Sequence, residues 1–183
     1  MIDEILLEAE EHFSQAIDAF RREASKLRTG RASPSLLDGV RVDYYGTSTP
    51  LNQAANVTVV DARLLQVKPW DVKMVGAIEK AILTGDLGLT PSNRGDVVLV
   101  PIPALTGDRR REMVKMLRAE AERAKVSIRA GRRDAMDMLE AMEDSSEDEV
   151  HRGKKEVQDR VDAAVKRVET HAVEKEAEIL KGP

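Results

Sequence analysis

Apolar side chains recur at intervals of three and four residues along three long stretches of the chain, which is the period of an amphipathic helix. The stretches cover residues 2–28, residues 105–144 and the region after Ser146. In the second stretch the apolar stripe comprises Met113, Leu117, Ala121, Ala124, Ile128, Ala135, Leu139 and Met142. Helices of this kind are marginal when isolated, so the pattern predicts an elongated antiparallel three-helix bundle.

Residues that favour helix ends stand at the borders of these stretches. Gly30 suits the left-handed position that follows a helix, and Thr106 suits the N-cap of the second helix. That helix would contain roughly 38 residues, which corresponds to about 57 Å. Ser146 and Glu149 have the spacing of a capping box, so a third helix is expected to begin there.

The chain between the first and second helices has a different composition. Six of the seven prolines, seven of the eleven glycines, both tyrosines and the only tryptophan lie between Gly30 and Pro103. Runs of β-forming residues cover residues 40–45, 56–60, 64–67 and 96–100. One helix is expected from about Val72 to Leu83, with Asp71 as its N-cap.

This division predicts a fold of the α+β class in which a small β/α/β domain is inserted into the bundle. The expected domains are residues 30–104 for the insertion, and residues 1–29 and 105–183 for the bundle. Two connecting segments join the domains, and Pro101 and Pro103 lie in the second one. Because so little chain crosses the border, we expect a hinge there.

Charge is divided along the length of the second helix. Residues 109–133 contain ten lysine or arginine residues and three glutamates, a net charge of +7, although the whole chain has a formal net charge of −4. Residues 134–149 contain eight acidic residues and no basic one. On a helical wheel a cationic stripe lies roughly 115° from the apolar stripe. The cationic stripe consists of Lys115, Arg118, Lys125, Arg129 and Arg132.

The cationic stripe has two interpretations. Charged helix faces are often simply solvated, and charge alone does not separate that interpretation from a polyanion-binding face. However, Lys125, Arg129 and Arg132 have no acidic residue four positions away to support the helix. Arginine also forms paired hydrogen bonds with phosphate and stacks on bases. The stripe therefore favours RNA or another phosphate-rich partner.

Other function classes receive little support. The chain has no cysteine, no phosphate-binding glycine motif and no apolar run near the ~20 residues that a membrane span needs. His12, His151 and His171 lack the paired spacing of metal ligands. We therefore expect a soluble, cytoplasmic protein without a cofactor, a metal or a membrane anchor. Because three helices can satisfy the apolar seams internally, we also expect a monomer.

Four segments of the chain, taken together, resemble the ribosome recycling factor family. They are KLRTGRASPSLL at residues 26–37, YYGT at residues 44–47 with the following Pro50-Leu51, GDLGLTP at residues 85–91, and IRAGRRDA at residues 128–135. The ordered set spans nearly the whole chain.

The resemblance implies an L-shaped, two-domain protein with a flexible hinge. It implies binding to the post-termination bacterial ribosome, with the bundle on large-subunit ribosomal RNA. The small domain would face the small subunit and elongation factor G, which hydrolyses GTP and drives the subunits apart so that mRNA and tRNA leave. The recycling factor itself would not be an enzyme.

The resemblance also implies roles for particular residues. It assigns RNA contacts to Arg129, Arg132 and Arg133. The cationic stripe adds Lys125 and Arg118 as candidates for the same surface. The family's hinge matches Arg28, Thr29, Gly30 and Arg31, to which Pro101 and Pro103 are added on the returning strand.

Gly131 departs from the pattern expected of the family, in which this position should bear a side chain. A glycine inside a helix costs about 1 kcal/mol relative to alanine. We therefore expect either a locally softer helix or the close approach of another backbone at this point.

Two alternatives to ribosome recycling remain open at this level. A helical adaptor would recruit protein partners through its apolar seams and would have no ribosomal role. An enzyme would need a pocket in the insertion, near Trp70, Tyr44 and Tyr45.

Overall fold

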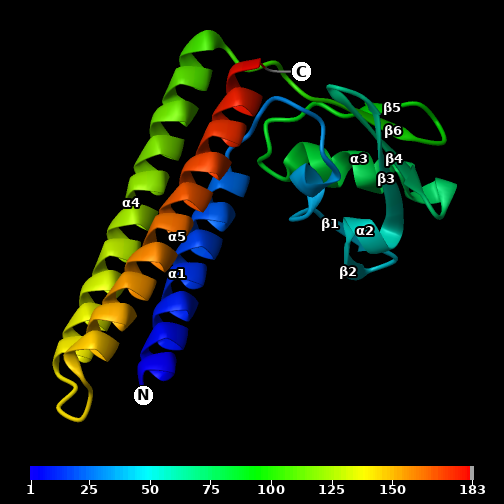
Figure 1. Cartoon of the computed structure of the whole chain (residues 1–183). Coiled ribbons are helices and arrows are strands. Elements are labelled where there is room, and N and C mark those ends of the chain that lie inside the picture. The colour runs from blue at the N-terminus through cyan, green and yellow to red at the C-terminus, as the bar shows by residue number, and fades with distance from the viewer. Residues whose placement is uncertain (182–183) are drawn as a thin grey trace. The chain divides into compact units, whose positions relative to one another are not determined.

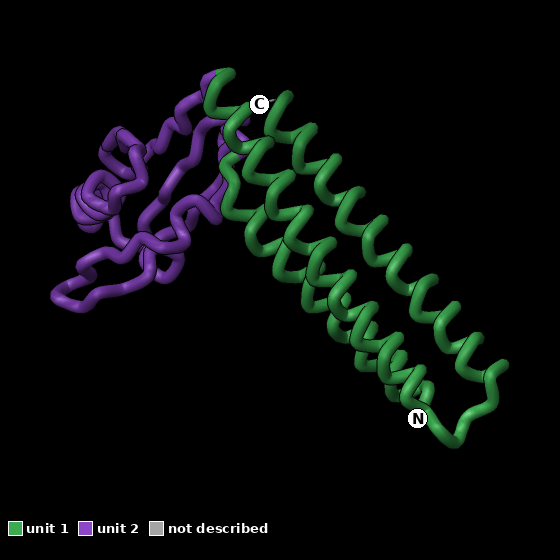
Figure 2. Tube along the Cα trace, turned by 90° about the vertical axis from the view of Figure 1, so that its left-hand side faces the viewer, with its two compact units in different colours: residues 1–28, 107–181 green, residues 29–106, 182–183 purple. Residues whose placement is uncertain are grey.

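The structure, a computed structural model, describes residues 1–181. These residues form two compact units, which Figure 2 shows in different colours. Unit 1 consists of Met1–Arg28 and Gly107–Lys181, and unit 2 consists of Thr29–Thr106. Among residues 1–181, every helix falls short of the length and apolar character that a membrane span requires.

Unit 1 is a bundle of three long helices, α1 (Ile2–Ser25), α4 (Gly107–Glu140) and α5 (Glu147–Lys181). The helices α1 and α5 run in one direction and α4 runs in the other (Figure 1). Each helix packs against the other two. The predicted antiparallel three-helix bundle is therefore confirmed.

The core of unit 1 is built almost entirely from the predicted apolar stripes. In α4 all the predicted positions are buried except Met142, which lies beyond the end of the helix and is half-buried. Large side chains with almost no exposure include Ile17 of α1, Leu117, Ile128 and Leu139 of α4, and Ile179 of α5. Burial of such a side chain contributes about 1.5–3 kcal/mol to the free energy of folding, so the seam stabilises the bundle.

The ends of the long helices differ in part from the predictions. Helix α4 contains 34 residues, because it ends at Glu140 and residues 141–146 form the connection to α5. Helix α1 ends at Ser25, with Lys26 still in a right-handed conformation. Gly30 does have a positive φ of 78°, but it lies within the connection to unit 2 and is not the cap of α1.

The predicted capping box of α5 is confirmed. The backbone N–H of Ser146 donates to Glu149 Oε2 at 2.9 Å, and the backbone N–H of Glu149 donates to Ser146 Oγ at 3.3 Å. These two bonds satisfy donors that the first turn of a helix leaves unpaired.

Unit 2 contains two antiparallel sheets. Strands β1 (Arg41–Tyr44) and β2 (Thr47–Pro50) form a hairpin. The second sheet has the order β3-β4-β6-β5, with β3 at Ala55–Asp61, β4 at Leu64–Pro69, β6 at Val98–Pro101 and β5 at Ser92–Asn93. Short helices complete the unit at Pro34–Leu37, Leu51–Ala54 (α2), Val72–Met74 and Val75–Thr84 (α3).

The helix α3 and the sheet strands share one apolar core. Ile78 and Ile82 of α3 and Leu65, Val67 and Val98 of the sheet are all fully buried. Asp71 accepts a hydrogen bond from the backbone N–H of Lys73 at 3.0 Å, which confirms it as an N-cap. The α+β class is confirmed, although the polar strand β2 and the two-residue strand β5 were not predicted.

Candidate RNA-binding face

The candidate face lies on the side of α4 that is turned toward α5. Arg118, Lys125 and Arg132 lie along this side, and each bonds to a residue of α5. Arg123 lies elsewhere on α4, near Glu23 of α1, whose carboxylate it influences electrostatically. Three of the five residues of the predicted cationic stripe therefore border the α4–α5 seam.

Two cations of the stripe are compensated by carboxylates of α5. Arg118 Nη2 lies 2.6 Å from Glu176 Oε1, and the same contact raises the pKa of the guanidinium above its ordinary value. Lys125 Nζ lies 3.0 Å from Glu169 Oε1, and its side chain is only 21% exposed. Each of these cations offers little unopposed charge to a polyanion.

The three arginines of the IRAGRRDA segment have different surroundings. Arg129 Nη1 lies 3.3 Å from Glu122 Oε1, a contact within α4. Arg132 Nε donates to the amide oxygen of Gln158 on α5 at 2.7 Å. Arg133 is exposed and has no hydrogen-bond or ion-pair partner within residues 1–181. Among these three arginines, positive charge is thus least compensated at Arg132 and Arg133.

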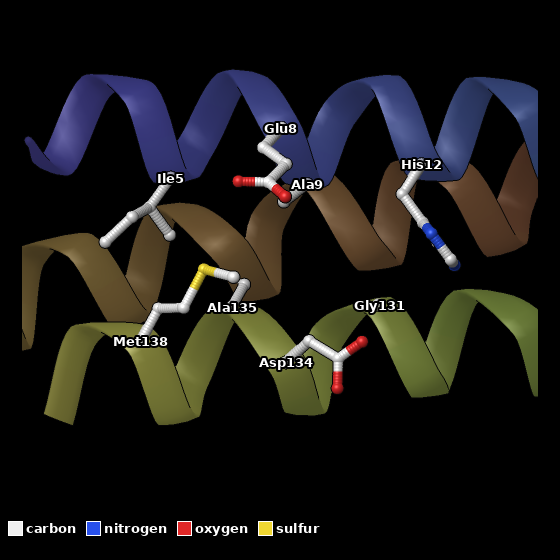
Figure 3. Close-up of a pocket in the computed structure, with 8 residues that line it drawn as sticks. All are labelled: Ile5, Glu8, Ala9, His12, Gly131, Asp134, Ala135 and Met138. Atoms are coloured by element: carbon white, nitrogen blue, oxygen red, sulfur yellow. The ribbon is translucent and has the colours of Figure 1, made fainter. Parts of the chain in front are cut away.

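Gly131, between these arginines, is buried beneath a side chain of α1 (Figure 3). A Cβ atom at this position would lie 2.5 Å from His12 Cδ2, which is closer than real contacts allow. His12 Nε2 lies 3.0 Å from the carbonyl oxygen of Ser127 and therefore donates to it. The close neighbour at Gly131 is a histidine ring and not a second backbone, so the expectation of an approaching backbone was wrong.

A crevice of about 140 Å³ adjoins this contact between α1 and α4. It is lined by Ile5, Glu8, Ala9, His12, Gly131, Asp134, Ala135 and Met138 (Figure 3). Within residues 1–181 no three acidic, histidine or cysteine side chains are arranged to bind a metal ion. The crevice is therefore a gap in the packing of α1 against α4, next to the segment that bears the arginines.

The candidate hinge residues lie in or beside the two connections between the units. Arg28 is the last residue of the first segment of unit 1, and Thr29 begins unit 2. Gly30 is buried beside Leu105 of the returning connection. A Cβ atom on Gly30 would lie 3.4 Å from Leu105 Cγ. Arg31 is exposed.

The returning connection is shorter than the sequence suggested. Pro101 is the last residue of β6 and is paired with Leu64 of β4. The next residue, Ile102, donates its backbone N–H to the carbonyl oxygen of Arg63 at 2.8 Å. Pro103 follows outside the sheet and is exposed. Pro101 is thus fixed within the sheet, whereas Pro103 belongs to the connection.

The sequence model of the ribosome recycling factor family matches residues 20–180. The chain belongs to the ribosome recycling factor family. The resemblance seen in its four sequence segments is therefore confirmed.

Individual members of the ribosome recycling factor family agree with this result. The ribosome-recycling factor of Saccharophagus degradans is 55% identical over 133 residues, which cover 73% of this chain and 72% of the relative. A solution structure of the ribosome recycling factor is 36% identical, with a TM-score of 0.77, over 98% of this chain and 97% of that one.

A second solved structure includes partners. It presents models for the T. thermophilus ribosome recycling factor and the E. coli elongation factor G bound to the E. coli post-termination complex. The matching chain of that structure is 42% identical in sequence to this chain and has a TM-score of 0.63. The match covers 98% of this chain and 99% of that one.

The sequence did not identify the partners of the basic residues. Glu169, Glu176 and Gln158 come from α5, and no spacing rule within α4 could reveal them. His12 was noted only as an isolated histidine. The His12 ring lies against Gly131 because α1 packs antiparallel on α4. In the sequence, the unusual glycine was the one indication of a close contact at this point.

Proposed function

We propose that this protein is a ribosome recycling factor that binds the post-termination bacterial ribosome. Together with elongation factor G and GTP, it would promote separation of the subunits and release of mRNA and tRNA. The observation that supports this most directly is the pair of uncompensated guanidinium groups, Arg132 and Arg133, on a bundle of the recycling factor family.

Electrostatics favour the bundle as the part that contacts ribosomal RNA. Unit 2 contains seven basic and seven acidic residues and is therefore neutral. The basic segment of α4 has a net charge of +7, within a chain that is acidic overall. At physiological salt, charges interact over about 8 Å, so a local basic face acts almost independently of distant acidic residues.

The two connections support a movable unit 2. Within residues 1–181, the chain crosses between the units at Arg28–Thr29 and at Thr106–Gly107. We place the hinge at residues 28–31 and 103–106, with Pro101 outside it because of its pairing in the sheet. Unit 2 would swing on this hinge when it receives force from elongation factor G and would face the small subunit.

The proposed role requires no chemistry from this chain. It would act as a cytoplasmic, monomeric, non-catalytic factor, with GTP hydrolysed by elongation factor G. Trp70 and Tyr45 are exposed on the surface of unit 2, and the hydroxyl of Tyr45 donates to Asp71. That arrangement gives no support to an enzymatic pocket at the two aromatic side chains.

Sedimentation with ribosomes tests the assignment of the RNA-binding face. Arg132→Ala should weaken ribosome binding and lower the slope of log affinity against log salt by about 0.7–0.9, the value for one lost phosphate contact. Arg123→Ala is the matched control, because it removes the same charge on the side of α4 near Glu23. Equal affinities and slopes for both variants and the wild type would exclude this face.

A splitting assay on purified post-termination ribosomes tests the function itself. The protein should separate subunits only when elongation factor G and GTP are both present. A helical adaptor would instead show binding to protein partners that is insensitive to salt, with no association with ribosomes. A crosslink that fixes unit 2 to the bundle should preserve binding and abolish splitting; full activity in the crosslinked protein would refute the hinge.

A further inference from the structure

Arg132 is the only cation among the five candidates for the RNA-binding face that bonds to a neutral side chain within residues 1–181. Its Nε atom donates to Gln158 Oε1 at 2.7 Å, from α4 to α5. Gln158 is half-buried and Arg132 is exposed. The guanidinium is therefore held at its inner edge while the rest of the group faces solvent.

The amide of Gln158 has a fixed orientation. Its Nε2 donates to Asp162 Oδ1 at 2.8 Å, one turn further along α5. Because the amide nitrogen is directed at this carboxylate, the amide oxygen is directed at Arg132. Asp162 thus fixes which end of Gln158 meets the arginine, without itself forming an ion pair with Arg132 within the described chain.

The neighbouring contacts on the same seam show what is unusual here. Arg118 and Lys125 meet carboxylates of α5 at 2.6 Å and 3.0 Å. A carboxylate holds a cation and also cancels its charge, whereas an amide oxygen holds the cation and leaves the charge intact. With Nε occupied, the two terminal nitrogens of Arg132 remain as a fork for two oxygens of one phosphate.

We propose that Gln158 is a positioning residue for RNA binding, which orients Arg132 toward a phosphate of ribosomal RNA without neutralising it. This inference rests on the proposed function of the α4 face. Orientation before binding reduces the side-chain freedom that is lost in the complex, and affinity rises by that amount. Because the amide is neutral, it adds no negative charge in direct contact with the guanidinium.

Two kinds of variant separate orientation from charge. Gln158→Leu removes the acceptor and keeps the charge of Arg132, so affinity should fall about 2- to 10-fold with an unchanged salt slope. The double variant Q158E/D162N keeps the net charge of the protein but moves a carboxylate onto Arg132. Its salt slope should fall by about 0.7–0.9. D162N alone keeps an oxygen acceptor for Gln158 and should retain the wild-type slope.

A double-mutant cycle distinguishes positioning from a general effect on the fold. In an Arg132→Ala background, Gln158→Leu should cause no further loss of ribosome binding, because its target is gone. A general structural effect would weaken binding equally in both backgrounds. Circular dichroism melting of each variant confirms that the bundle is folded, and Q158E/D162N provides the test if Gln158→Leu does not fold.

The outcomes separate this inference from the proposed function. If Arg132→Ala weakens binding while every Gln158 variant retains the wild-type affinity and slope, the positioning role is wrong and the RNA-binding face stands. If Arg132→Ala itself has no effect on ribosome binding, both the face and the positioning role are overturned.

Discussion

Gly131 and His12 form a matched pair, and substitution of the glycine tests the match. Gly131→Ala adds a Cβ atom 2.5 Å from His12 Cδ2 and 3.1 Å from both His12 Cγ and Nε2. The ring must therefore move away from α4. That movement breaks the 3.0 Å hydrogen bond from His12 Nε2 to the carbonyl oxygen of Ser127.

Opposing terms set the size of the effect. Alanine favours a helix interior over glycine by about 1 kcal/mol. Loss of the hydrogen bond costs about 0.5–1.5 kcal/mol, and overpacking costs about 1–3 kcal/mol. The unfavourable terms are larger, so we expect a net loss of roughly 0.5–3.5 kcal/mol in the free energy of unfolding.

The effect of Gly131→Ala on the free energy of unfolding should change sign when the His12 ring is absent. In a His12→Ala background the steric conflict and the hydrogen bond are both gone, so Gly131→Ala should stabilise the protein by about 1 kcal/mol. Urea unfolding followed by circular dichroism gives all four free energies of the cycle. Stabilisation by Gly131→Ala in both backgrounds would show that His12 does not occupy this space.

Three further predictions concern other parts of the chain. Hydrogen bonds from the backbone and side chain of Ser146 lower the pKa of Glu149 below its ordinary value of 4.5. The ionised carboxylate therefore stabilises the fold above pH 4.5, and this stabilisation is lost as the pH falls through the lowered pKa. The difference in Tm between the wild type and Glu149→Ala should therefore shrink between pH 6 and pH 3; a constant difference would contradict the capping box. The hydroxyl of Tyr45 lowers the pKa of Asp71, and Tyr45→Phe should raise it toward the ordinary value in an NMR titration, whereas an unchanged titration would place the hydroxyl elsewhere. Gly30 has a φ of 78°, and Gly30→Ala should cost about 1–2 kcal/mol in the unfolding of unit 2, measured by hydrogen exchange. Gly39→Ala, where a Cβ meets no atom within 4 Å and φ is not positive, is the control.

Periodicity and local spacing were sufficient for much of the fold. The steps of three and four residues identified the seam that includes Leu117, Ile128 and Leu139, and all three are fully buried. The spacing of Ser146 and Glu149 identified the start of α5. These features depend on residues close together in the chain, so a single sequence can reveal them.

Contacts between distant segments were beyond the reach of such patterns. Lys125 has no acidic residue four positions away, yet it is compensated by Glu169 of α5. His12 and Ser127 are 115 positions apart and meet only through the packing of α1 on α4. Such pairs depend on the register between helices, which the apolar stripes do not specify at the level of single side chains.

The carboxylates of α5 have a consequence for selectivity. An open row of five cations would attract any nucleic acid in the cell, since phosphate contacts are blind to sequence. Glu176 and Glu169 oppose Arg118 and Lys125 within the row, whereas Arg132 and Arg133 meet no carboxylate within residues 1–181. On the proposed RNA-binding face, an RNA would therefore gain most where its phosphates reach Arg132 and Arg133.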